Sequence, residues 1–151
     1  MGSLETSRNG KRSRVVLVDD HPIVRFALAR LINQEEDLEV CADAGNYEEA
    51  LHAVLTSRPA IVLVDICLGD IDGLELTRTI RHMDAHLPVL VLSMRDETHY
   101  AARALAAGAQ GYVMKQEGPD IILRAVRTVL GGERYLSARM MDRSRPTLAA
   151  P

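Results

Sequence analysis

The chain has no tryptophan, little aromatic character (3%) and few cysteines or lysines. Its two cysteines, Cys41 and Cys67, are too few for a disulfide framework or a paired-cysteine metal site. No apolar run approaches the roughly 20 residues that a membrane-spanning helix needs, and the polar residues 1–13 lack the apolar core of a secretory signal. A net charge of −3 gives no overall attraction to nucleic acid. We therefore expect a cytoplasmic protein that acts without a membrane.

The 151 residues are 47% hydrophobic, which is enough for one domain with a substantial core. Four short apolar runs stand out, namely VVLV at 15–18, IVLV at 61–64, VLVL at 89–92 and the weaker GYVM at 111–114. Such uninterrupted runs are typical of strands that are buried on both faces of a sheet. Helix-length segments separate them, so the sequence predicts an α/β domain with a parallel sheet.

Five strand–helix units are expected. The strands are predicted at about 14–18, 38–44, 61–65, 89–92 and 111–114. The helices are predicted at about 21–34, from Asn46, after Asp72 as an N-cap, at about 96–107, and from Pro119 to Gly131. Residues 1–13 are expected to be a disordered polar segment, 14–132 the folded domain, and 133–151 a linker or tail.

Reactive polar side chains follow the apolar runs. They are Asp19 and Asp20 after the first run, Asp65 after the run at 61–64, Ser93 after 89–92 and Lys115 after 111–114. Because parallel strands end at one edge of a sheet, where open α/β sheets bind ligands, we expect these side chains to converge. Taken singly, Asp20 reads as a helix cap, Ser93 as a turn residue and Lys115 as a solvated residue. Lys115 is notable because the only other lysine, Lys11, lies in the polar N-terminal segment.

Charge repulsion limits what such a cluster can do. Two carboxylates about 4 Å apart repel by roughly 4 kcal/mol at an effective dielectric constant of about 20. One lysine cannot offset this for three carboxylates, so the cluster needs a divalent cation or a shared proton. Oxygen ligands suit Mg²⁺, and Mg²⁺, a lysine and a hydroxyl around a carboxylate can hold a phosphoryl group. The residues therefore predict Mg²⁺-dependent phosphoryl transfer onto an aspartate.

The segments VLVDDHPIVR, IVLVDICLGDIDG, VLVLSM and GAQGYVMK resemble the receiver domain of bacterial two-component response regulators. DDHP, LSMRDE and GGERYLS are most similar to the NarL/FixJ (LuxR-type) subfamily. The resemblance covers about residues 14–132 and implies a flavodoxin-like (βα)₅ doubly wound parallel sheet with strand order 2-1-3-4-5. It implies a phosphoacceptor signalling domain rather than an enzyme, with at most self-phosphotransfer and slow autodephosphorylation.

The resemblance also implies roles for the carboxylates. Asp65 would accept the phosphoryl group from a sensor histidine kinase or from acetyl phosphate. Asp20, Asp65 and the main-chain carbonyl of Cys67 would ligate Mg²⁺, and Asp19 would act through water.

The remaining implied roles concern the switch and its output. Ser93 and Lys115 would contact the phosphoryl group. Tyr112 would turn inward when Ser93 is drawn towards that group. The activated domain would form a homodimer. LuxR-type regulators bind DNA through a helix-turn-helix, and the residues after 132 are too few for one. We therefore expect DNA contact and transcription control only through an output domain absent from this chain.

Several positions depart from the family pattern, among them Gly69 and Gln116. Gly69 stands where many receivers have proline. Gln116 replaces a proline that often follows the lysine in a cis peptide, and because a non-proline cis peptide costs about 2.5–4 kcal/mol, the isomer at this bond is left open.

Three alternatives remain. The chain could be a stand-alone receiver, or a pseudo-receiver that serves as a dimerisation module without phosphorylation. It could also be a phosphatase of the haloacid-dehalogenase type, which uses an aspartate nucleophile on a similar sheet. That class needs Asp-x-Asp after the first strand, whereas His21 and Pro22 follow Asp19-Asp20 here.

Overall fold

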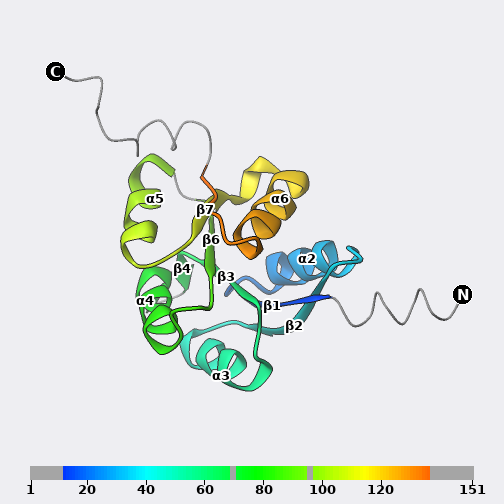
Figure 1. The fold of residues 1–151 in the computed structure, drawn as a ribbon, viewed down its shortest axis with the longest axis horizontal. Coiled ribbons are helices and arrows are strands. Elements are labelled where there is room, and N and C mark those ends of the chain that lie inside the picture. The colour runs from blue at the N-terminus through cyan, green and yellow to red at the C-terminus, as the bar shows by residue number, and fades with distance from the viewer. Residues whose placement is uncertain (1–11, 69–70, 95–96, 137–151) are drawn as a thin grey trace, which may run out of the picture.

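The computed structural model describes residues 12–68, 71–94 and 97–136. Its main sheet has five parallel strands in the order β2-β1-β3-β6-β7 (Figure 1). Their bounds are β1 Ser13–Val18, β2 Leu38–Ala44, β3 Ile61–Asp65, β6 Val89–Ser93 and β7 Gly111–Met114. Numbered along the chain as parallel strands, this is the order 2-1-3-4-5. The predicted flavodoxin-like α/β fold is confirmed.

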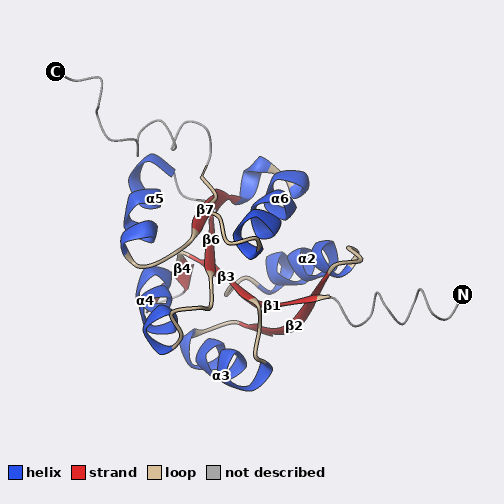
Figure 2. Ribbon diagram, in the orientation of Figure 1, coloured by secondary structure: helices blue, strands red, loops and turns tan. Residues whose placement is uncertain are grey.

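Helices connect the strands and cover both faces of the sheet. They are α2 Pro22–Asn33, α3 Tyr47–Ser57, α4 Gly73–Met83, α5 Glu97–Ala106 and α6 Pro119–Leu130. Helices α2 and α6 lie on one side of the sheet, and α3, α4 and α5 lie on the other (Figure 2). In the described ranges, no helix combines the length and the apolar character needed to cross a membrane.

Local signals explain where several helices begin. Pro22 and Pro119 are the first residues of α2 and α6, positions where proline loses no intrahelical hydrogen bond. Asn46 caps α3 by accepting the amide N–H of Glu49 at 2.9 Å. The Glu49 carboxylate in turn accepts the N–H of Gly45 at 3.0 Å. This reciprocal pair is the predicted capping-box arrangement, moved by one residue on the glutamate side.

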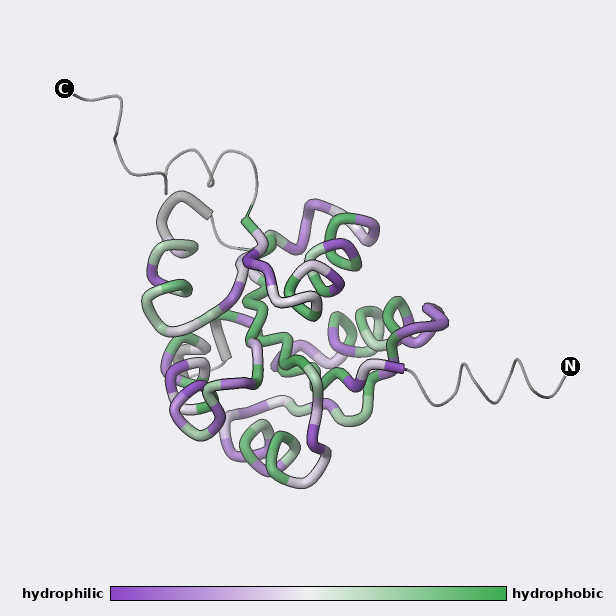
Figure 3. Tube along the Cα trace, viewed as in Figure 1, coloured by the Kyte–Doolittle hydropathy of each residue, from purple (hydrophilic) through white to green (hydrophobic). Residues whose placement is uncertain are grey.

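The core lies on both faces of the sheet. Val15 and Leu17 of β1 pack in a cluster with α2 and α6, whereas Val16 and Val18 pack in a second cluster with α3 and α4. Because successive strand side chains point to opposite faces, both faces need apolar residues. This explains the uninterrupted apolar runs, which appear as green tube through the centre of the molecule in Figure 3.

Two features were not expected from the sequence. A short antiparallel hairpin of β4 (Cys67–Leu68) and β5 (Ile71–Asp72) follows β3. Asp72 thus directly precedes α4 as predicted, but its side chain lies outside the described residues, so its capping role stays a prediction.

The second feature is the chain after α6, which returns to the sheet. The N–H of Tyr135 donates to the carbonyl of Gln110 at 3.0 Å, and the carbonyl of Tyr135 accepts the N–H of Tyr112 at 3.1 Å. Tyr135 forms a parallel bridge with Gly111, and Leu136 is buried. The chain therefore contacts the domain beyond residue 132, where a linker was predicted. The predictions for residues 1–11 and 137–151 lie outside the described part.

Candidate functional site

The carboxyl edge of the sheet collects the polar strand-end residues. Asp65 ends the central strand β3, and its neighbours in the sheet are β1 and β6. Asp19 follows β1, and Ser93 is the last residue of β6. Asp19, Asp65 and Ser93 have 1%, 5% and 0% exposure, although the protein buries few other polar residues in its described part. These side chains therefore line a water-poor edge of the sheet.

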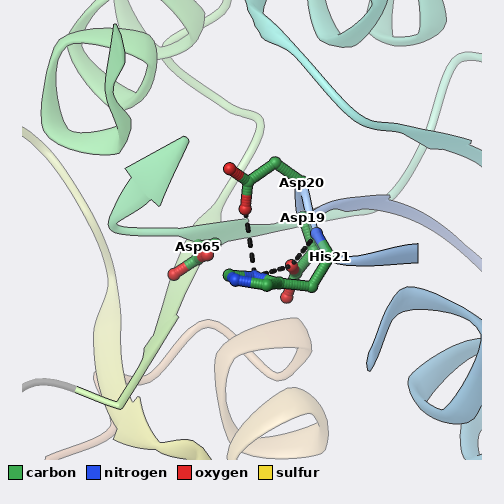
Figure 4. Close-up of side chains that lie close together, drawn as sticks. All are labelled: Asp19, Asp20, His21 and Asp65. Atoms are coloured by element: carbon green, nitrogen blue, oxygen red, sulfur yellow. Dashed lines mark hydrogen bonds and ion pairs between the residues drawn. The ribbon is translucent and has the colours of Figure 1, made fainter. Parts of the chain in front are cut away.

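Three carboxylates converge there. Asp19, Asp20 and Asp65, together with His21, each present one ligand atom within 4.8 Å of the others (Figure 4). Asp20 is partly exposed, with 27% of its side chain accessible, so it opens the cluster to solvent. The three carboxylates therefore lie together at the carboxyl edge of the sheet, as predicted.

His21 is a member of this group that the sequence reasoning did not include. Its N–H donates to Asp19 Oδ1 at 2.9 Å, and its Nδ1 lies 3.2 Å from Asp19 Oδ1 and 3.0 Å from Asp20 Oδ1. Figure 4 shows the ring between the two carboxylates. The available signal was its position directly after Asp19-Asp20.

Lys115, directly after the edge strand β7, reaches the cluster. Its Nζ donates to Asp19 Oδ2 at 2.5 Å and lies 3.7 Å from Asp65 Oδ2. Only 11% of the lysine side chain is exposed. The described residues contain no cis peptide bond, so the Lys115–Gln116 bond is trans. The ammonium thus bridges two carboxylates and partly offsets their repulsion.

A short turn supports the position of Lys115. The 3₁₀ turn η1 covers Lys115–Glu117, and Glu117 Oε2 accepts the N–H of Met114 at 3.0 Å. Gln116 lies in this turn as an exposed residue. The backbone of Lys115 is therefore part of a hydrogen-bonded turn, although Gln116 takes the place of the proline that often follows this lysine in the family.

Tyr112 lies inside the protein. Its exposure is 1%, and it packs in a cluster with Ile66, Leu74 and Ala101. In the sheet it pairs with Val91, while Met114 pairs with Ser93. Tyr112 on β7 therefore lies beside β6 at a position two residues before Ser93. Cys67 begins β4, two residues after Asp65, and its side chain and Gly69 lie outside the described part.

The donor set fits a divalent cation of the Mg²⁺ type. The ligand atoms that the three aspartates offer are carboxylate oxygens, and two of these side chains are buried. Lys115 supplies one positive charge against three negative ones, so a divalent cation relieves the remaining repulsion. The site is thus suited to bind a cation and, next to it, the oxygens of a phosphoryl group.

The chain matches the family described as "Response regulator receiver domain" over residues 15–127. It is 39% identical over 122 residues to the transcriptional activator protein ExaE of Pseudomonas putida, which covers 81% of this chain and 57% of that protein. It is 32% identical over 132 residues to the transcriptional regulatory protein DegU of Brevibacillus brevis, covering 87% of this chain and 56% of that protein. The chain therefore spans less than two thirds of the length of these curated relatives.

Solved structures of similar proteins agree. A two-component response regulator of the LuxR family from Aurantimonas sp. SI85-9A1 superposes with a TM-score of 0.82 at 36% identity, covering 87% of this chain and 94% of that chain. The signal receiver domain of the putative response regulator NarL from Mycobacterium tuberculosis gives 0.76 at 28% identity, with 82% and 99% covered.

Proposed function

Since the chain belongs to the response regulator receiver family, we propose that it accepts a phosphoryl group on Asp65 and signals through a conformational change. The observation that supports this best is the buried Asp65 carboxylate, with the Lys115 ammonium 3.7 Å away and two further aspartates beside it. A carboxylate held next to a cation can act as a nucleophile towards phosphorus. The chain is accordingly a receiver domain of a signalling protein rather than a classical enzyme.

A divalent cation belongs to this proposal. Asp20, Asp65 and the main-chain carbonyl of Cys67 would hold Mg²⁺, with Asp19 acting through water. When bound, the cation neutralises charge on the carboxylates and on the phosphoryl oxygens. The three carboxylates within 4.8 Å supply the donor chemistry that such a cation requires.

The protein's own residues carry the transfer. A carboxylate oxygen of Asp65 attacks the phosphorus of a phosphohistidine in a sensor histidine kinase. The phosphorus–nitrogen bond breaks, and its electron pair returns to the donor imidazole. Lys115 is placed to donate to an oxygen of the transferred group, and the Ser93 hydroxyl would donate to another. Acetyl phosphate would serve as a small donor through cleavage of its phosphorus–oxygen bond.

Phosphorylation replaces the single negative charge of the buried Asp65 carboxylate with an acyl phosphate that carries about −1.5 to −2 charge. We infer that this draws Lys115 and Ser93 towards Asp65, and that Tyr112 repacks in response. The face formed by α5, β7 and α6 would then change and favour a homodimer. The transcriptional roles in the names of ExaE and DegU support a transcriptional output, exerted in the cytoplasm through DNA-binding parts of a longer protein.

Intact-mass measurement tests the proposal. The protein is mixed with Mg²⁺ and acetyl phosphate, and we expect one adduct of about 80 Da, the mass of a PO₃ group. The adduct should be absent in Asp65→Asn and after chelation of Mg²⁺. Asp120→Asn, which removes an exposed carboxylate in the first turn of α6, is the matched control and should keep the adduct.

Two other results would contradict the proposal and identify the alternatives. Turnover of phosphate esters without a lasting adduct indicates a phosphatase. An unmodified protein that still dimerises indicates a receiver-like module that works without phosphorylation.

A further inference from the structure

Arg25, in the first turn of α2, contacts the backbone of the site. Its Nη1 donates to the main-chain oxygen of Asp19 at 2.6 Å, and its Nε lies 3.1 Å from Asp43 Oδ1. The side chain is 24% exposed. We propose that Arg25 is a positioning residue that fixes the peptide between Asp19 and Asp20 and so aims both carboxylates at the metal site. The proposal rests on the proposed function.

Both backbone polar groups of Asp19, its N–H and its carbonyl, form hydrogen bonds. Its N–H donates to the carbonyl of Ala44 at 3.0 Å, and its carbonyl accepts from Arg25. Because the peptide group is planar, holding its oxygen restricts the last backbone torsion of Asp19 and the first of Asp20. These torsions set the directions in which the two side chains leave the chain. Arg25 thus acts on the site through its backbone.

The end of β2 supplies both supports. Ala44 accepts the N–H of Asp19, and the preceding residue, Asp43, pairs with Arg25. Asp43 therefore holds the guanidinium in the position from which it reaches Asp19. A lysine has one nitrogen and cannot make both contacts from a fixed planar group. The arrangement is specific to arginine.

Gly45 leaves room for this guanidinium. A Cβ at this position would lie 2.8 Å from Arg25 Nη1 and 3.6 Å from its Cζ. Gly45 is not among the described glycines with positive φ, so its backbone does not itself require glycine. The absence of a side chain at Gly45 therefore leaves space for the guanidinium of Arg25. This is a second observation, independent of the hydrogen bonds, that supports the position of Arg25.

Titration with Mg²⁺ alone, followed by amide NMR shifts, tests the role of Arg25. We expect Arg25→Ala to weaken Mg²⁺ binding by about tenfold, the lower end of the effect of removing a group that supports metal ligands. The Mg²⁺ affinity of Arg25→Lys should lie between that of Arg25→Ala and that of the wild type. Thermal unfolding without Mg²⁺ is measured in parallel, so that loss of affinity is separated from loss of fold.

Arg14 provides a matched control. It lies near the opposite end of β1 and also bonds one carbonyl and one carboxylate, those of Ser57 at 2.9 Å and Glu39 at 3.3 Å. Arg14→Ala removes the same groups far along the strand from the site. We expect its Mg²⁺ affinity to equal that of the wild type.

Gly45→Ala tests the same idea without removing the charge, and it decides the matter if Arg25→Ala does not fold. The added methyl displaces the guanidinium, so Mg²⁺ binding should weaken. Gly131→Ala is the control, because Gly131 has φ −77° and its Cβ would meet its nearest neighbours at 3.4 Å.

Wild-type affinity in Arg25→Ala or Gly45→Ala overturns the positioning role, as does an equal loss in Arg14→Ala. If the wild type takes up the phosphoryl group on Asp65 and only this comparison fails, the proposed function stands. A wild type that binds no Mg²⁺ and forms no adduct overturns both.

Discussion

At the scale of single residues, Asp20 shows how the site balances chemistry against stability. It lies within 4.8 Å of Asp19 and Asp65, while Lys115 pairs most closely with Asp19. Asp20→Asn removes one charge and keeps the shape. We expect the free energy of unfolding without divalent cations to rise by about 1–2 kcal/mol, a part of the roughly 4 kcal/mol repulsion of a close pair.

The same substitution should remove the stabilisation that Mg²⁺ gives to the wild type, since a ligand stabilises only the state it binds. Urea unfolding with and without Mg²⁺ measures both effects, and Asp120→Asn again serves as the control. An Asp20→Asn protein that Mg²⁺ stabilises as strongly as the wild type would show that Asp20 is not a ligand.

The single residues also show what sequence can and cannot predict about the site. Asp65 and Lys115 follow apolar runs, and the rule that parallel strands end at one edge is enough to bring them together. The contacts of His21 and Arg25 depend on side-chain conformations and on the path of the chain after β2. The position of His21 directly after Asp19-Asp20 places it near the site, but no spacing in the sequence encodes the side-chain contacts themselves.

At the scale of elements, Arg127 ties α6 to the segment between α2 and β2. Its Nε and Nη2 donate to the two carboxylate oxygens of Asp37 at 2.9 and 2.8 Å, and Nη2 also donates to Glu35 at 2.6 Å. Hydrogen bonding to Arg127 holds the pKa of the Asp37 carboxyl below its ordinary value near 3.8. The arginine therefore makes a charge-dependent clamp between two elements.

We expect Arg127→Ala to lower the free energy of unfolding by about 1 kcal/mol at neutral pH, since the three side chains are partly exposed and water screens their charges. The pKa of Asp37 is lower in the folded state than in the unfolded state. The contribution is therefore complete above pH 3.8 and is lost as the pH falls through the folded pKa. Urea unfolding at neutral and acid pH should show the two proteins converging. A constant difference, or an equal loss in Arg124→Ala on the same helix, argues against the clamp.

Gly111 controls how the chain after α6 joins the sheet. A Cβ there would lie 2.7 Å from the carbonyl oxygen of Tyr135 and 3.0 Å from Leu90 Cδ1. We expect Gly111→Ala to cost about 1–3 kcal/mol by overpacking and to detach Tyr135. Amide hydrogen exchange should then accelerate at Tyr135, whose N–H donates to Gln110. Unchanged exchange would show that the bridge survives the substitution, and Gly131→Ala is the control.

That bridge marks the limit of pattern reading for elements. Tyr135 pairs as a single bridge, and the hairpin after Asp65 has strands of two residues. Neither feature is long enough to leave a recognisable pattern in the sequence. The apolar runs of the main sheet are long enough. The domain edge and the loop beside the site were therefore the parts of the fold that could not be predicted.

At the scale of the whole molecule, the order of the strands follows from the chain's alternation. Strand–helix–strand connections in one sheet are almost always right-handed, which leaves few ways to place helices on both faces. The apolar residues of α6, among them Ile122, Val126 and Val129, are buried within the domain. Large exposed apolar side chains occur instead on α2, where Ile23 is 84% and Phe26 65% exposed.

The proposed switch joins Asp65 to dimerisation through Tyr112. To move an equilibrium from 1:99 to 99:1, the phosphoryl group must favour one state by about 5.5 kcal/mol. We expect wild-type protein with Mg²⁺ and acetyl phosphate to shift from monomer to dimer in size-exclusion light scattering, and Asp65→Asn to stay monomeric. Tyr112→Leu, which keeps an apolar side chain in the core, should retain the mass adduct and lose the shift.

Tyr112→Phe keeps the ring and removes only the hydroxyl, so it separates the effect of ring packing from that of the O–H group. Because coupling between two equilibria is reciprocal, dimer formation must favour the phosphorylated form over the unphosphorylated form by the same factor at equilibrium. Adduct formation should therefore increase with protein concentration in the wild type and not in Tyr112→Leu. A concentration-dependent adduct in Tyr112→Leu would mean that the phosphorylated site reaches the dimer by a route other than Tyr112.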